Sequence, residues 1–347
     1  MNEHRIVQYT FEEEHSQAYR QLLLKTYKEF NYSQAFADLK SKLKNPQNPF
    51  FQFGEIQNFI AYSNSAPVGH LSAIIDPRLR TVDNKQIGLI GFYESNEDFS
   101  VSKELFDSAL QYLKLKNCNA IRGPIDLTIW HPYRFAFDQN PNSVFNFEPM
   151  NHKFYPAQFL QLGFKEASKY SSLKRGDLET MLEYSKRVSE PLSEAGYTIH
   201  KASPENFLQA SRTVHELSNK IFRENWSFVP LSFDEFSFLY GQNSNIENHA
   251  ILELLKEPCG ETIGFALGIP DLITNSLVLK TIGILPEKKS TWGGILLGES
   301  QINWAKKLGF DSIIFALRKD EKVTKNVIYN NSARIREYSA FELNLDS

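Results

Sequence analysis

The feature that most constrains the fold of this chain is an internal repeat between residues 60–113 and residues 255–308. Both segments contain the same order of turn, strand, strand and helix. Two pairs of matched glycines have the same spacing of 195 residues: Gly69 with Gly264, and Gly88 with Gly283. Self-similarity at a constant offset indicates two copies of one structural unit. A chain of 347 residues is about twice the usual domain length, so it can bury two separate cores.

Each copy predicts a helix that connects two parallel strands. The helix of the first copy has its apolar residues at helical spacing: Leu105, Phe106, Ala109, Leu110 and Leu113. In the second copy, a helix that contains Ile295 and Leu308 leads into the β-like run 312–317. A strand–helix–strand connection after a hairpin gives a mixed sheet. The sequence therefore predicts an α/β fold with two tandem domains, residues 1–178 and 179–347, which join within 172–200.

Composition excludes several classes of function. A formal net charge of −3 with scattered lysines and arginines argues against nucleic acid or an anionic membrane as the main partner. Cys118 and Cys259 are too few for a disulfide framework, and the histidines show no ligand spacing, so no metal site is predicted. No run approaches the ~18 apolar residues of a membrane-spanning helix, and the first residues lack the apolar core of a signal peptide. We expect a cytoplasmic protein.

The second copy carries a loop suited to binding phosphate. Residues 285–294 follow a predicted strand and lead into a helix, whose N-terminus offers unpaired N–H groups and a partial positive charge. Lys288 and Lys289 add positive charge, while Gly293 and Gly294 let the backbone approach an anion. The loop predicts a pyrophosphate site, although two glycines at a helix start also serve packing alone.

The first copy lacks these features at the matching positions. With the offset of 195 residues, the counterpart of 288–293 is 93–98, which contains Glu94, Glu97 and Asp98. Carboxylates at close range would repel a pyrophosphate by several kcal/mol in a partly shielded site. We therefore expect only the second copy to bind the cofactor.

These segments resemble the GNAT acyltransferase superfamily in its tandem form. The pyrophosphate motif of that family is R/Q-x-x-G-x-G/A, and here it reads Lys288-x-x-Thr291-x-Gly293, with threonine at the first glycine position. Further segments are similar to a bacterial tandem subfamily: 91–94, 122–128, 155–156 and 162–164 in the first copy, and 225–231, 264–267, 270–271 and 336–338 in the second. The resemblance covers nearly the whole chain and does not name a substrate.

The resemblance implies an N-acyltransferase. The donor would be acetyl-CoA, a longer acyl-CoA or an acylated carrier protein, and the acceptor a small-molecule amine. A backbone N–H at the end of the strand, at Ile284 or Leu285, would polarise the thioester carbonyl. The donor would contact the residues of the loop: Lys288, Lys289, Ser290, Thr291, Trp292, Gly293 and Gly294.

Four residues are candidates for proton transfer. Asp271 or Glu287 could take the proton of the amine, although both are also residue types of turns and helix starts. The resemblance implies a tyrosine that protonates the leaving thiolate, and Tyr329 and Tyr338 are the candidates, with an aromatic core residue as the alternative. The first copy has Phe159 where such a tyrosine is expected, which favours a silent first copy.

The acceptor site is the least determined part. Asn225 and Trp226 could form a pocket wall or a helix end, and Trp130 and Tyr133 could line an acceptor pocket or belong to a surface loop. Trp292 and the 27 phenylalanines raise a second hypothesis, a long-chain acyl group moved to an amino-lipid or amino acid. A third hypothesis, favoured by the threonine in the motif, is a non-catalytic binding or scaffold protein.

Overall fold

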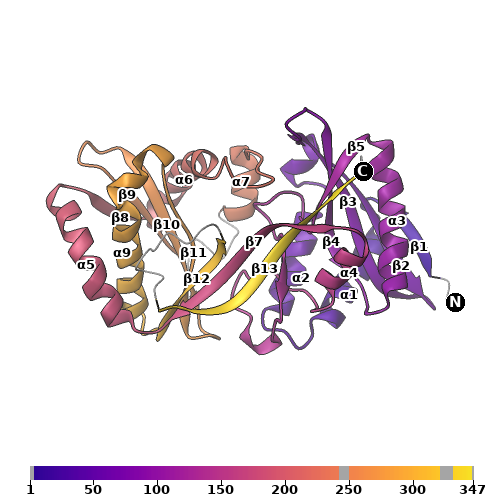
Figure 1. The fold of residues 1–347 in the computed structure, drawn as a ribbon, viewed down its shortest axis with the longest axis horizontal. Helices are drawn as coiled ribbons and strands as arrows, with labels where there is room; N and C mark the ends of the chain where they lie inside the picture. Colours follow the sequence, from indigo (N-terminus) through magenta and orange to yellow (C-terminus); the bar gives the residue numbers. More distant parts are fainter. Residues whose placement is uncertain (1–3, 242–249, 321–330, 346–347) are drawn as a thin grey trace. The chain divides into compact units, whose positions relative to one another are not determined.

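The chain folds into two compact α/β units. A computed structural model describes residues 4–241, 250–320 and 331–345 (Figure 1). Unit 1 comprises Met1–Lys169, Trp226–Val229 and Glu337–Ser347, and unit 2 comprises Tyr170–Asn225 and Pro230–Arg336. Each unit contains a mixed sheet with helices, so the predicted α/β fold in two tandem parts is confirmed.

Unit 1 has the strand order β1–β2–β3–β4–β5–β13. Neighbouring strands are antiparallel except β4 and β5, which are parallel and connected by helix α3. Its elements are β1 (Arg5–Tyr9), α1 (Glu13–Thr26), α2 (Ser33–Leu43), η1 (Pro49–Gln52), β2 (Glu55–Ser63), β3 (Ala66–Arg80), β4 (Gln86–Glu94), α3 (Phe99–Leu115), β5 (Cys118–Gly123), β6 (Phe135–Phe137), η2 (Pro141–Ser143), α4 (Tyr155–Gln161) and most of β13 (Ala333–Asn344).

Unit 2 has the strand order β7–β12–β11–β10–β9–β8. Here β11 and β12 are the parallel pair, and helix α9 connects them. Its elements are part of β7 (Lys165–Arg175), α5 (Leu178–Glu194), β8 (Thr198–Lys201), η3 (Pro204–Asn206), α6 (Phe207–Ile221), α7 (Phe233–Tyr240), β9 (Ile251–Lys256), β10 (Thr262–Asp271), β11 (Ser276–Ile284), η4 (Pro286–Thr291), α9 (Gly293–Lys307) and β12 (Ser312–Lys319).

Each sheet contains a strand from the end of the other sequence copy. Strand β7 ends the first copy, yet its residue Arg175 pairs with Ile313 of β12 in unit 2. Strand β13 ends the second copy, yet its residue Phe341 pairs with Gly123 of β5 in unit 1. No single boundary along the chain therefore separates the two units.

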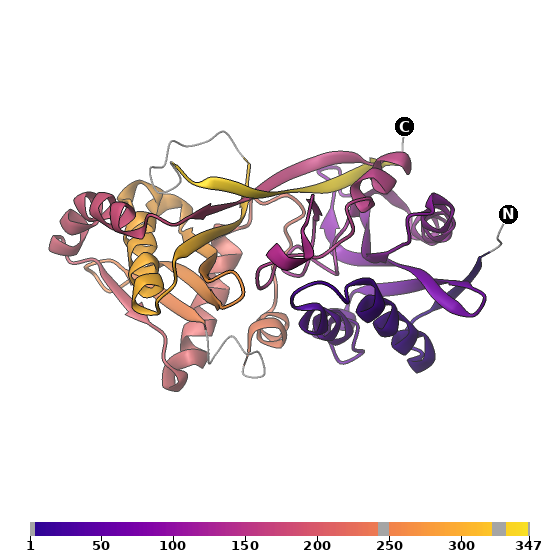
Figure 2. The same ribbon diagram turned by 90° about the horizontal axis from the view of Figure 1, so that it is seen from below.

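The helices between the parallel strands form for the reasons visible in the sequence. In α3 the apolar residues Leu105, Phe106, Ala109 and Leu113 are buried against the sheet. The carboxylate of Asp98 caps this helix by accepting the N–H of Ser100 at 2.9 Å. In unit 2, α9 packs beside α5 (Figure 2). Within the described ranges, no helix is both long enough and apolar enough to cross a membrane.

The strand register corrects one detail of the repeat. The last ladder pair between the parallel strands is Leu89 with Arg122 in unit 1 and Leu279 with Phe315 in unit 2. Measured from this pair, the strands β4 and β11 are offset by 190 residues rather than 195. The predicted equivalence of Gly88 with Gly283 is therefore wrong. The physical reason is that β3 and its turn to β4 are longer than β10 and its turn to β11.

Candidate functional site

The two parallel strands of unit 2 separate from each other near their carboxyl ends. Strands β11 and β12 pair from Ser276 and Ser312 up to Leu279 and Phe315, and the ladder then stops although β11 continues to Ile284. Strand β12 instead pairs with β7 on its other side. Backbone groups along the end of β11 are thus left facing a gap in the sheet.

A cavity of about 350 Å³ lies at this gap. Ligand pockets commonly start at about 300 Å³, so the cavity is large enough for one end of a substrate. The sheet supplies an apolar part of its lining: Leu279, Ile282, Gly283, Ile284 and Phe315. The helices and the η4 loop supply the rest: Ile221, Phe222, Asn225, Lys289, Gly294 and Gly298.

The cavity reaches both faces of the sheet, because successive strand residues point to opposite faces. A Cβ atom on Gly283 would lie 3.1 Å from the side chain of Ile221, so this position faces α6. The neighbouring Ile284 approaches α9 instead, since its side chain lies 3.8 Å from the Cβ position of Gly294. The gap therefore connects the α9 face with the α6 face, and a thioester held on the α9 face can reach side chains on the α6 face.

Backbone alternation also decides which N–H group faces the gap. The N–H of Leu285 donates to the carbonyl of Ile263 at 2.9 Å, on the β10 side of the strand. N–H groups of successive strand residues point to opposite sides, so those of Ile284 and Ile282 point towards β12 and the gap. Of the two predicted oxyanion donors, Ile284 has the required direction, while the N–H of Leu285 is used in the sheet.

The first turn of α9 lies beside the cavity and carries no side-chain cap. Its N-cap residue, Trp292, has a left-handed backbone (φ 59°), and its side chain makes no capping hydrogen bond. A Cβ on Gly293 would lie 2.5 Å from the end of the Leu255 side chain, so a larger residue there would have to displace this leucine. Gly294 is different: within the described part of the chain its Cβ position meets Ile284 alone, at an ordinary 3.8 Å. The helix start is therefore open to an anion on the Gly294 side.

The two predicted lysines have different surroundings. Lys288 forms an ion pair with Glu257 at 2.7 Å, and this carboxylate raises the pKa of Lys288. Lys289 is exposed and lines the cavity. Thr291, which departs from the family motif, donates its hydroxyl to the carbonyl of Lys288 at 2.7 Å and so stabilises the turn. Lys289 is the cation better placed to meet a bound phosphate.

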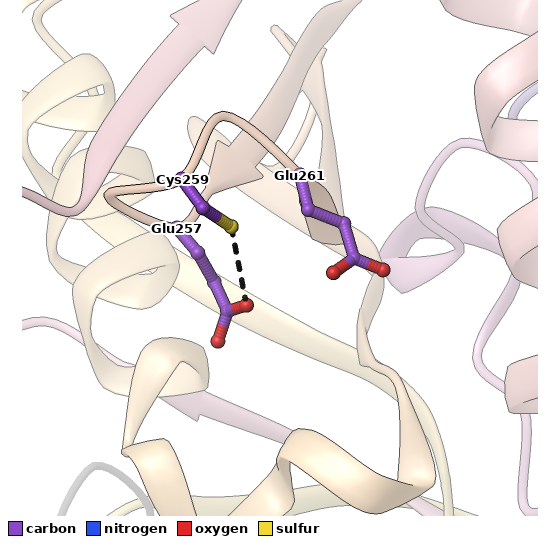
Figure 3. Close-up of side chains that lie close together, drawn as sticks. All are labelled: Glu257, Cys259 and Glu261. Carbon is purple, nitrogen blue, oxygen red and sulfur yellow. Dashed lines mark hydrogen bonds between the residues drawn. The ribbon is translucent and has the colours of Figure 1, made fainter.

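Loop residues between β9 and β10 bring three possible metal ligands together (Figure 3). The ligand atoms of Glu257, Cys259 and Glu261 all lie within 4.8 Å of one another. Lys288 already balances the charge of Glu257, and the other two residues are exposed. The ion pair with the η4 loop therefore accounts for the position of Glu257.

The corresponding gap in unit 1 is filled by protein. Beyond Leu89, the N–H of Ile125 donates to the carbonyl of Ile90 at 2.8 Å, and the carboxylate of Asp126 accepts the N–H of Phe92 at 2.5 Å. A Cβ on Gly91 would lie 2.2 Å from the carbonyl oxygen of Ile125, so only glycine permits this contact. Asp126 thus bonds a backbone N–H where a ligand oxygen would sit in an open gap.

Charged and polar side chains are buried around this filled gap. Asp126 forms an ion pair with the buried Lys40. Glu94 is completely enclosed and accepts hydrogen bonds from the hydroxyls of Tyr27 at 2.9 Å and Tyr155 at 2.8 Å. Burial raises the pKa of Glu94 to about 7, against the opposing effect of Lys40. Glu94 and Ile284 both lie five residues beyond the last ladder pair, so a buried carboxylate stands where unit 2 has an apolar cavity wall.

A second buried pair lies next to it. Lys44 contacts the hydroxyl of Tyr9 at 2.8 Å and Nε2 of His70 at 2.9 Å, while Nδ1 of His70 lies 2.7 Å from the carbonyl of Phe92. Burial holds the pKa of Lys44 well below its usual value, and burial together with Lys44 does the same for the pKa of His70. These contacts hold the end of β4 in place, so it is not free to bind a ligand.

None of the three predicted catalytic residues that the structure describes lines the cavity. Asp271 accepts the N–H groups of Ile273 and Thr274, both at 3.0 Å, and closes the β10–β11 turn at the end of the hairpin away from Ile284. Tyr338 is buried in unit 1 and donates to Glu148 at 2.7 Å. Neither residue lines the cavity. Glu287 is exposed in η4 and does not line the cavity either.

Two further predictions cannot be placed. Tyr329 lies outside the described residues, and the same holds for the side chain of Ser290. Their predicted roles stay predictions.

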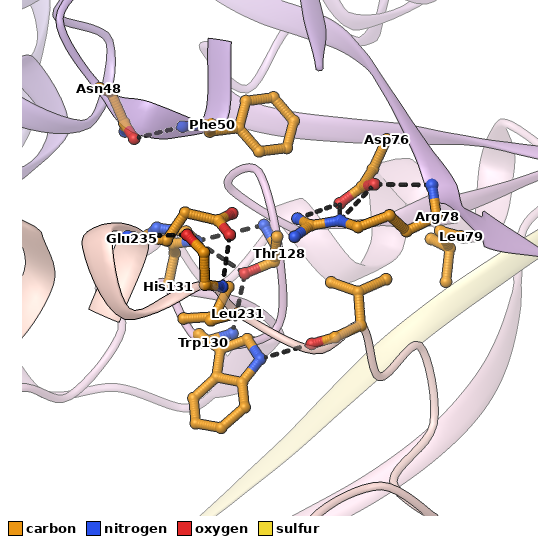
Figure 4. A network of polar contacts seen from close by, with 12 residues as sticks. Asn48, Phe50, Asp76, Arg78, Leu79, Thr128, Trp130, His131, Leu231 and Glu235 are labelled. Atoms are coloured by element: carbon orange, nitrogen blue, oxygen red, sulfur yellow. Dashed lines mark hydrogen bonds and ion pairs between the residues drawn. The ribbon is translucent and has the colours of Figure 1, made fainter. Parts of the chain in front are cut away.

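The predicted acceptor residues divide between the units. Asn225 lines the cavity of unit 2. Trp226 belongs to unit 1, where its ring lies 5.0 Å from the guanidinium of Arg122. The indole N–H of Trp130 donates to the carbonyl of Val229 at 2.9 Å, within a network of polar contacts that also contains the Thr128–His131 hydrogen bond (Figure 4). Tyr133 packs against Arg134 in the same loop.

Sequence reasoning missed the α6 wall of the cavity. Ile221 and Phe222 end an amphipathic helix, and their apolar character looks like that of any core-facing helix residue. Gly298 was also missed, although its spacing of four residues from Gly294 places both on one face of α9. That spacing was the only available signal.

Comparison with known proteins supports the fold. No protein-family model matches the chain. The tandem GNAT protein from the clavulanic acid biosynthesis pathway superposes with a TM-score of 0.62, covering 99% of this chain and 98% of that one at 9% sequence identity. The chain therefore has the tandem GNAT fold.

Two curated relatives match in sequence. The bacterial ceramide synthase of Caulobacter vibrioides is 22% identical over 241 residues, which are 68% of this chain and 62% of that protein. Protein YghO of Escherichia coli is 25% identical over 224 residues, which are 62% of this chain and 55% of that protein. Each match spans less than two thirds of the relative's own length.

Proposed function

We propose that this chain is an N-acyltransferase that moves an acyl group from acyl-CoA to an amine within the cavity of unit 2. The observation that carries the proposal is the cavity itself, which lies where parallel strands separate, beside an uncapped helix start. The tandem GNAT fold supports the same reaction class, because the neighbouring folds include N-acetyltransferases.

The donor would be held by the α9 start and the gap between the strands. Its pyrophosphate would accept hydrogen bonds from the N–H groups of Gly293 and Gly294 at the start of α9, and Lys289 adds a positive charge. The thioester end then enters the apolar gap beside Ile284. An acylated carrier protein would present the same thioester without the nucleotide, so donor identity depends on whether the phosphate contacts are used.

The chemical step needs polarisation of one carbonyl and the transfer of one proton. The amine nitrogen forms a bond to the thioester carbon, and the negative charge that develops on oxygen is stabilised by the N–H of Ile284. Collapse of the intermediate breaks the C–S bond. The nitrogen loses a proton and the departing thiolate gains one, for which Tyr329 remains our candidate.

A longer acyl chain and an amino-lipid acceptor form the more specific version of the proposal. Six of the cavity's lining residues have large apolar side chains: Ile221, Phe222, Leu279, Ile282, Ile284 and Phe315. The relative from Caulobacter vibrioides is a ceramide synthase, whose product is an acylated amino lipid. Both observations favour a fatty acyl group over acetyl.

Binding and thiol release together test the proposal. The whole chain is heated with acetyl-, octanoyl- and palmitoyl-CoA, and a ligand present at 100 times its Kd should stabilise it by about 2.7 kcal/mol. CoA release is then measured with a simple amine and with a long-chain amino alcohol. Absence of both a thermal shift and thiol release with every donor would exclude an acyl-CoA enzyme and leave a carrier-protein donor or a scaffold role.

A further inference from the structure

The two helical walls of the unit 2 cavity differ in what they present. The α9 wall consists of the glycines Gly294 and Gly298, whereas the α6 wall consists of the bulky residues Ile221 and Phe222. The cavity therefore has one smooth side without side chains and one side that ends in branched and aromatic groups.

Packing does not explain why α9 has a glycine at Gly294. Gly298 lies in the helix interior, where a glycine costs about 1 kcal/mol relative to alanine. Among the residues that the structure describes, the Cβ position of Gly294 has one neighbour within 4 Å, the side chain of Ile284 at 3.8 Å, so alanine would fit. Gly294 and Gly298 are one helical turn, about 6 Å, apart and both line the cavity, so this strip of α9 adds no side chain to the cavity wall.

The α6 wall is held in place by the sheet. The Cβ position of Gly283 lies 3.1 Å and 3.2 Å from two side-chain carbons of Ile221, so helix and strand are already in close contact. The ring of Phe222 packs edge-on against Phe265 at 6.4 Å between centroids. This wall cannot retreat from a ligand without separating α6 from β11.

We propose that Ile221 and Phe222 set the length of the acyl chain that the cavity accepts, while the Gly294–Gly298 strip gives the chain its path. This inference rests on the proposed acyltransferase function and adds the residues that select the substrate. An acyl chain that passes through the gap from the α9 face meets these two side chains on the α6 face.

Substitutions at Ile221 should change chain-length preference in opposite directions. Ile221→Ala opens the wall, and each extra methylene that becomes buried is worth about fourfold in binding. We expect the ratio of kcat/KM between longer and shorter acyl-CoA donors to rise about 15-fold for a chain two carbons beyond the wild-type optimum. Ile221→Trp fills the wall and should lower the use of long donors about tenfold, with a smaller loss for acetyl-CoA.

Leu217→Ala is the matched control. Leu217 is buried on α6 one turn before Ile221 and does not line the cavity, so its truncation costs packing without changing the wall. Its chain-length profile should equal that of the wild type. Thermal shifts with the same series of donors give a readout that does not depend on turnover.

Each outcome is decisive. Opposite shifts in Ile221→Ala and Ile221→Trp, with none in Leu217→Ala, support the inference. An unchanged profile in both Ile221 variants, or an equal loss for every donor, overturns it and leaves the acyltransferase proposal standing. A wild-type protein that neither binds nor consumes any acyl-CoA overturns both.

Discussion

Units 1 and 2 each contain a pair of parallel strands connected by a helix. The units differ in what occupies the space where the two strands of the pair separate. In unit 2, β11 and β12 separate beside a cavity of about 350 Å³. In unit 1, β4 and β5 separate around Ile125 and Asp126, which bond directly to the end of β4. The fold thus creates a gap in each unit, and the sequence around the gap decides whether it can bind a ligand.

The two gaps also differ in the charged groups that surround them. Unit 1 buries the charged pair Lys40–Asp126 and the carboxyl of Glu94 at its gap. Unit 2 lines its gap mainly with apolar side chains and keeps Lys289 exposed at the helix start. Groups that are fully paired inside a protein stabilise one conformation and are not free to meet a ligand.

The largest expected effect is the loss of the buried ion pair in unit 1. Asp126→Ala leaves Lys40 buried without its partner and the N–H of Phe92 without an acceptor, which should destabilise unit 1 by about 3–5 kcal/mol. Hydrogen exchange of the β4 and β5 amides measures this locally. Asp126→Leu combined with Lys40→Met is the control and should recover much of the loss, since apolar replacement of both partners is often neutral.

The next largest expected effect is the change in the stability of unit 1 with pH that arises from Glu94. Its carboxyl titrates near 4.5 when unfolded and at about 7 when folded, so the neutral form stabilises unit 1. That contribution is complete below pH 4.5 and is lost as the pH rises to 7, by at most about 3 kcal/mol. Glu94→Gln can still accept the hydrogen bonds of Tyr27 and Tyr155 and should remove this part of the pH dependence. Exchange rates with the same pH slope in both proteins would contradict the assignment.

Filling the cavity of unit 2 should remove donor binding with little effect on unit 1. Gly294→Leu places a branched side chain in the cavity and should weaken acyl-CoA binding at least ~100-fold, or about 2.7 kcal/mol. Titration calorimetry measures the change. Asn303→Leu is the control, because Asn303 is exposed on the same helix and does not line the cavity. Retained affinity in Gly294→Leu would mean that the donor binds elsewhere.

The smallest effect separates the two lysines. Lys289→Ala should weaken acyl-CoA binding about fivefold, or about 1 kcal/mol, and the loss should shrink at high salt. Lys288→Ala should change binding less than twofold, because Lys288 is paired with Glu257. Equal losses in the two variants would show that the ion pair opens when the donor binds.

Sequence reasoning predicted the parts of this molecule that depend on local pattern. The apolar spacing of Leu105, Phe106 and Ala109 predicted α3, and the repeated order of turn, strand and helix predicted two α/β units. The resemblance to the tandem GNAT superfamily predicted the fold that the comparisons support. These features are encoded by neighbouring residues, so a single sequence reveals them.

The remaining features depend on contacts between distant segments. Nothing in the local sequence of β7 indicates that it pairs with β12 of the second copy. The same is true of β13, which pairs with β5 of the first copy. Asp126 and Phe92 are 34 residues apart, so the filled gap in unit 1 could not be anticipated from the acidic residues alone. The cavity wall at Ile221 was hidden for the same reason, because its role arises from contact with Gly283 across the sheet.

The stoichiometry of acyl-CoA binding tests the central claim most directly. Calorimetric titration of the whole chain with the best-bound acyl-CoA should give one site per chain. The variant Glu97→Lys, which removes an acidic residue near the start of α3 in unit 1, should keep one site of the same affinity, and Gly294→Leu should have none. Two sites per chain, or one site that survives Gly294→Leu, would contradict the claim that unit 2 alone binds the donor.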